Sequence, residues 1–157
     1  MQGFNVAEMG HVVNVIPPVD ITGGKKGDIF SMENYAHATI IIQIGVSAAA
    51  ATKILVNECT DFSGSDRTAI AHAIYKEETA AGDTLGARVA AAAAGETPSD
   101  NDTIFYVIEL DARELSDGSQ FVEVEITNAS ANSVIASAVA ILSGSRYGGD
   151  QSATAIA

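Results

Sequence analysis

The side chains that could do chemistry in this 157-residue chain are few, and they lie far apart in the sequence. The three histidines, His11, His37 and His72, form neither a His-x-His nor a His-Glu-x-x-His pattern, which a zinc site would use. The single cysteine, Cys59, can form neither an internal disulfide nor a thiolate cluster. We expect no metal site and no cofactor, and each histidine is expected to be structural or exposed.

Two pairs of carboxylates suggest glycoside hydrolysis at first sight. Glu77 and Glu78 are adjacent on an expected strand and therefore point to opposite faces, whereas Glu123 and Glu125 are better interpreted as a solvated strand face. The Gly-x-Ser-x-Gly elbow of acyl-transfer enzymes is absent, and residues 23–27 lack the spacing of a phosphate-binding loop. We expect no catalytic residue and no enzyme activity. A binding module or hydrolase whose pocket forms from distant residues stays open as an alternative.

The charge balance narrows the set of partners. The chain has 20 acidic residues against 8 Lys and Arg, which gives a formal charge of −12. Such a chain repels nucleic-acid phosphates and anionic lipid, so we expect no nucleic acid and no membrane partner. Residues 1–11 lack the basic and apolar regions of a secretory signal, and we expect synthesis in the cytoplasm without export by the general pathway.

The elements that must position these side chains are strands. β-Branched residues and period-two alternation predict strands at residues 38–46, 52–60, 69–76, 103–110, 121–127 and 133–142. The alanine-rich residues 82–95 are also interpreted as a strand, and Asp111–Leu115 as a helical turn with a capping box. The predicted fold is all-β, an antiparallel β-sandwich, jelly-roll-like, with at most one short helical turn. Jelly-roll and immunoglobulin-like strand orders are not separable by sequence.

Both ends of the chain look suited to bridging between subunits. We predict a single β-sandwich domain over residues 1–157, with an extended N-terminal arm at 1–18 and a Gly- and Ser-rich C-terminal arm at 143–157. Either arm could add a strand to the sheet edge of a neighbour. The candidate assembly contacts are Val12, Val13, Val15, Ile16, Arg146, Tyr147 and Ile156.

Five segments follow one another in a characteristic order: Asp28–Tyr35, Ile40–Ile44, Tyr106–Leu115, Ala140–Tyr147 and the small-residue end Thr154–Ile156. Their order resembles that in a group of small tailed-bacteriophage virion structural proteins of the capsid decoration or cement type. The resemblance implies a non-enzymatic protein that binds the major capsid protein, bridges capsomers and associates as a homo-oligomer, with a trimer favoured. Because packaged DNA repels a charge of −12, the outer capsid surface is the expected location. A tail or neck component of the phage is the alternative.

Overall fold

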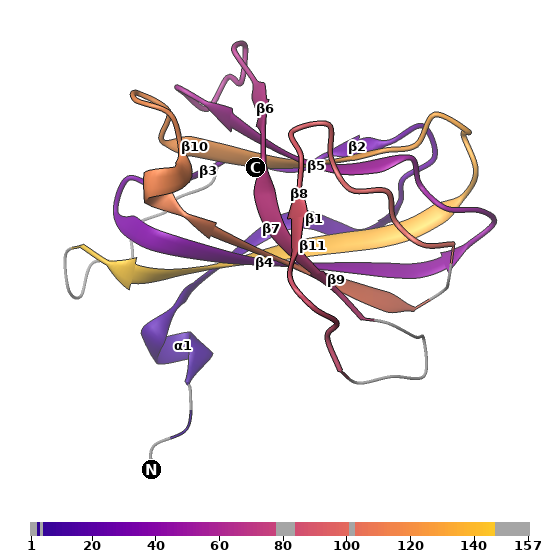
Figure 1. Cartoon of the computed structure of the whole chain (residues 1–157), viewed down its shortest axis with the longest axis horizontal. Helices are drawn as coiled ribbons and strands as arrows, with labels where there is room; N and C mark the ends of the chain where they lie inside the picture. The colour runs from indigo at the N-terminus through magenta and orange to yellow at the C-terminus, as the bar shows by residue number, and fades with distance from the viewer. Residues whose placement is uncertain (1–2, 4, 78–83, 101–102, 147–157) are drawn as a thin grey trace.

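Two β-sheets form the layers of the molecule in a computed structural model that describes residues 3, 5–77, 84–100 and 103–146 (Figure 1). A single helical turn precedes the first strand, and a 3-10 turn separates β9 from β10. The elements, in chain order, are α1 (Val6–Met9), β1 (His11–Asp20), β2 (Lys25–Lys26), β3 (Phe30–Ser31), β4 (Tyr35–Ser47), β5 (Lys53–Cys59), β6 (Thr68–Ile70), β7 (His72–Lys76), β8 (Val89–Ala91), β9 (Ile104–Asp111), η1 (Ala112–Glu114), β10 (Phe121–Thr127) and β11 (Val134–Ser145).

The strands pair in the order of a jelly roll. β1 pairs with β11, β2 and β3 pair with β10, β4 pairs with β9 and β5 pairs with β6, all antiparallel. These are the pairings of one long hairpin rolled on itself. The six-stranded sheet has the order β1-β11-β4-β9-β7-β8, and the five-stranded sheet has the order β2-β10-β5-β6 with β3 also on β10. The predicted antiparallel, jelly-roll-like sandwich is therefore confirmed.

The core lies between the two sheets and is built from alternate residues of the central strands. In β4, Ile40 and Ile42 are fully buried, whereas Ile41 between them is half-buried on the outer face. The inward positions of β11 are mostly alanines, and those of β10 are Val122, Val124 and Ile126. This period of two follows from the pleat of a strand, and it explains why these strands are recognisable in the sequence.

The N-terminal region corrects the prediction of an extended arm up to residue 18. Residues 11–20 form β1, an edge strand of the six-stranded sheet that pairs with β11. Val13, Val15 and Ile16 are at most 5% exposed, and an irregularity in register between Asn14 and Ile16 allows the adjacent Val15 and Ile16 both to face the core. The register shifts between Ile16 and Val19, where the two prolines lie, and an edge strand tolerates prolines at such an irregularity.

Two other segments differ from their predicted form. Residues 69–76 were expected to be one strand, but β6 pairs with β5 in one sheet while β7 pairs with β9 in the other, and Ala71 separates them. The alanine run forms only the short β8 and then turns at Gly95, whose N–H donates to the Ala92 carbonyl at 2.8 Å. Gly95 has a φ of 81°, which a side chain would disfavour.

Candidate assembly surface

Both chain ends leave the sandwich at the same place. His11, the first residue of β1, is paired with Leu142 near the end of β11, and α1 lies beside that end of the sheet (Figure 1). The Arg146 N–H donates to the Asn34 carbonyl at 2.9 Å and fixes the chain where it leaves β11. We call this region, made of α1, the 32–35 turn, η1 and the end of β11, the terminal end.

The predicted assembly contacts divide into three groups. Val12 is 55% exposed on the outer side of β1, and Arg146 is exposed at the terminal end. Val13, Val15 and Ile16 are core residues, so the folded chain cannot offer them to a partner. Tyr147 and Ile156 lie outside the described residues. The C-terminal arm also begins later than predicted, because residues 143–145 belong to β11.

Two shallow hollows at the terminal end share Arg146. The larger, of about 290 Å³, is lined by Ala36, Asp111, Ala112, Arg113 and Arg146. The smaller, of about 120 Å³, lies between Met32, Glu33, Ala112, Leu115, Gln120 and Arg146. Within the described ranges, the Arg146 guanidinium has no hydrogen-bond partner, while Arg113 pairs with Asp111 at 3.0 Å and is 86% exposed. Two guanidinium groups therefore border one hollow in a strongly acidic chain, and such groups recognise carboxylates.

His37 is bridged between two carboxylates next to this hollow. Its Nδ1 lies 2.9 Å from Asp111 Oδ1, and its Nε2 lies 2.6 Å from Glu109 Oε2, which also accepts a hydrogen bond from Thr39. Ionised carboxylates only accept hydrogen bonds, so the arrangement favours an imidazolium that donates from both nitrogens. Burial lowers the pKa of His37, but the bonds to Asp111 and Glu109 outweigh burial and the net shift is upward. The bond to His37 is in turn the main reason that the pKa of Asp111 is lowered.

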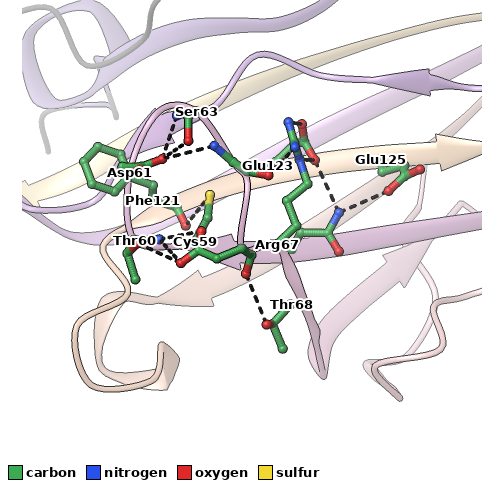
Figure 2. Close-up of polar contacts among 12 residues, drawn as sticks. Cys59, Thr60, Asp61, Ser63, Arg67, Thr68, Phe121, Glu123 and Glu125 are labelled. Atoms are coloured by element: carbon green, nitrogen blue, oxygen red, sulfur yellow. Dashed lines mark hydrogen bonds and ion pairs between the residues drawn. The ribbon is translucent and has the colours of Figure 1, made fainter.

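The face of the five-stranded sheet carries a second ion pair, which corrects the interpretation of Glu123 as solvated. Glu123 is 1% exposed, and Arg67 binds both of its oxygens, with Nε at 2.6 Å from Oε2 and Nη2 at 2.8 Å from Oε1 (Figure 2). The Asn57 amide donates to Glu123 at 3.4 Å and to Glu125 at 3.2 Å. Only Glu125 keeps the partial exposure that was expected of both.

The loop before Arg67 holds this arginine over the sheet. Asp61 accepts hydrogen bonds from the N–H and hydroxyl of Ser63, which lower its pKa (Figure 2). The Phe62 ring packs edge-on against Phe121, with the ring centroids 4.5 Å apart. The Arg67 guanidinium also donates to the Gly64 carbonyl. Cys59 is buried beneath this loop, and burial raises the pKa of its thiol, so the thiolate needed for reactivity is disfavoured.

The remaining histidines occupy structural positions. His11 stacks on Tyr35 with ring centroids 5.8 Å apart. His72 is 5% exposed and donates from Nδ1 to the Ile70 carbonyl at 3.2 Å, and burial lowers its pKa. Over the part of the chain that the structure describes, no group of His, Cys, Asp and Glu side chains is arranged to hold a metal ion. Among those same residues, no helix has the length and apolar character needed to cross a membrane.

Comparison with known proteins gives little to add to this geometry. No protein-family model matches the chain, and no curated protein matches it. A solved structure titled "Crystal structure of SPBc2 prophage-derived protein YomS" is similar to this chain with 16% sequence identity and a TM-score of 0.47. The alignment covers 87% of this chain and 96% of that one.

Proposed function

We propose that the chain is a non-enzymatic structural protein of a tailed-phage particle that binds the outer surface of the capsid and stabilises it by bridging capsomers. The observation that carries the proposal is the terminal end. β1 begins and β11 ends there, and Arg113 and Arg146 border its larger hollow. A rigid sandwich whose first strand begins where its last strand ends offers one end for anchoring on a larger assembly, and many weak anchors on a closed shell act together.

The segments that carry the resemblance to decoration proteins are also neighbours in space. Ile40–Ile44 lies in β4, the segment from Tyr106 in β9 and the segment from Ala140 in β11, and these three strands are adjacent in the order β11-β4-β9. The segment Asp28–Tyr35 reaches the terminal end through β3 and the following turn. Apart from Tyr147 and Thr154–Ile156, which lie outside the described residues, the segments that carry the resemblance therefore lie close together in the fold.

The net charge supports an external location. At −12 the chain is repelled by packaged DNA, whereas the two arginines of the terminal end offer local positive charge for carboxylates on a shell protein. A tail or neck subunit is the second candidate, because the same end of the fold could anchor the chain in a ring of tail or neck subunits. A tail-tube subunit would, however, assemble into rings or tubes by itself.

A binding experiment with capsids that lack the chain tests the proposal. We expect the purified chain to sediment with such shells and to raise the temperature at which they release DNA. The Arg113→Ala/Arg146→Ala variant should bind about tenfold more weakly, which corresponds to about 1.4 kcal/mol. Arg88→Ala, a substitution of an exposed arginine away from the terminal end, is the matched control and should bind like the wild type. Full-strength binding by the double variant would contradict the proposed role of the terminal end.

A further inference from the structure

The outward side chains of the six-stranded sheet include a band of apolar residues that crosses the strands beside polar neighbours such as Thr39, Gln43 and Ser137, and we call this surface the outer sheet face. Cross-strand pairs join its members: Val12 lies opposite Ile141, Val139 opposite Ile41, Ile41 opposite Val107, and Val107 opposite Tyr75. Val12 is 55% exposed and the nearby Phe105 is 38% exposed, while the other members are half-buried. The surface thus crosses five neighbouring strands, β1, β11, β4, β9 and β7.

This face is nearly free of the negative charge that dominates the chain. The outward positions of β11, β4, β9 and β7 contain two carboxylates, Glu109 and Asp111, and both are bonded to His37. Asp111 also pairs with Arg113. A chain with a formal charge of −12 therefore presents a sheet face that carries a band of apolar residues and whose charges are compensated locally.

We infer that the outer sheet face is the surface on which a second copy of this chain packs. Two copies that each carry −12 repel one another everywhere except where charge is absent or compensated, and this face meets that condition. A basic partner would instead be drawn to the acidic remainder of the surface. Because the same surface is used by both copies, the contact is isologous and closes at two, with the sheets stacked about 10 Å apart.

The size of the face is near the minimum for a specific interface. Five strands at about 4.8 Å and seven residues at about 3.4 Å per residue, the length of 37–43 in β4, cover at most roughly 570 Å² per copy, since β7 has five residues and polar positions such as Thr39 and Gln43 are included. Two copies would bury at most about 1,140 Å², close to the lower limit of about 1,000–1,200 Å² for stable contacts. The dimer should therefore dissociate on dilution, with a micromolar rather than a nanomolar dissociation constant. The inference concerns a different surface from the terminal end and does not depend on the proposed function.

Sedimentation velocity over a concentration series of the full chain tests the inference. We expect a monomer–dimer equilibrium that Ile41→Glu weakens at least about 100-fold, because a carboxylate would be buried at the centre of the contact. Val46→Glu is the matched control, since Val46 is 66% exposed at the end of β4 and lies outside the face. Val139→Glu provides a second test, and thermal unfolding establishes that each variant is folded.

Three results would overturn the inference. A wild-type monomer up to about 1 mM would show that the face does not self-associate. A dimer that folded Ile41→Glu and Val139→Glu variants leave intact would place the contact elsewhere. A trimer, which the resemblance to decoration proteins implies, would be incompatible with two-fold packing of this face.

Discussion

Replacement of Arg67 by Met tests whether the ion pair on the five-stranded sheet is a structural requirement. The variant leaves Glu123, which is 1% exposed, with the Asn57 amide at 3.4 Å as its remaining side-chain hydrogen-bond partner among the described residues. Removal of one partner from a buried pair typically costs about 3–5 kcal/mol. Arg67 itself is 29% exposed, so part of its charge is hydrated and we place the cost at about 3 kcal/mol. For a chain of this length, that corresponds to a fall in Tm of about 6–12 °C.

Substitution of the partner residue, Glu123, should lower the free energy of unfolding by less, and the difference between the two losses is the sharper test. Glu123→Gln removes the buried charge and leaves Arg67, which can turn its guanidinium toward water, so we expect a loss of about 1–2 kcal/mol. Arg113→Met is the matched control: Arg113 also pairs with a carboxylate but is 86% exposed, and we expect less than about 0.5 kcal/mol. Urea unfolding followed by circular dichroism measures all three. If Arg67→Met costs no more than Arg113→Met, the reasoning about burial is wrong.

Three further predictions concern the sheet, the edge strand and one turn. The pKa of His37 is raised in the folded chain, so its ion pairs stabilise the fold fully below the unfolded pKa of about 6.5, and this stabilisation is lost as the pH rises through the folded pKa. His37→Gln should therefore lower the free energy of unfolding by about 0.5 kcal/mol at pH 6 and by nearly nothing at pH 9, as measured by urea titrations at both pH values. Ile16→Ala should lower the free energy of unfolding by about 2–4 kcal/mol, because Ile16 is fully buried. Val12→Ala should lower it by less than about 0.5 kcal/mol, because Val12 is 55% exposed. Equal losses would mean that β1 does not contribute to the core. Gly95→Ala should cost about 2 kcal/mol more than Gly118→Ala in thermal unfolding, since both have positive φ but only at Gly95 would a Cβ lie 2.5 Å from the Ile54 carbonyl oxygen.

The fold could be predicted from the sequence wherever one side of a strand is apolar. β4, β9, β10 and β11 have clear alternation or dense β-branched residues, and η1 has its capping glutamate, Glu114, three residues after Asp111. β1 was missed as a strand because Pro17 and Pro18 suggest the end of an arm, yet an edge strand has room for them at an irregularity in register. The alternation of apolar residues continues unchanged from β6 to β7, although the chain crosses from one sheet to the other there, so the local sequence does not indicate the crossing.

The candidate surfaces were harder to predict because they depend on strand register. His37 lies 72 residues from Glu109, and only the pairing of β4 with β9 brings the two together. Arg67 and Glu123 are 56 residues apart, and the loop that carries Arg67 has the composition of an ordinary turn. Arg146, which the sequence predicts as an assembly contact, is exposed, but its hollow forms from η1, β4 and β9 as well as its own segment.

Immunogold electron microscopy of intact particles, with antibody raised against this chain, tests the proposed outer location most directly. Mass spectrometry of the same preparation establishes that the chain is present. We expect gold label distributed over the whole head. Label confined to the tail or neck would replace decoration by the second candidate function, and unlabelled particles that contain the chain would contradict an exposed position on the capsid.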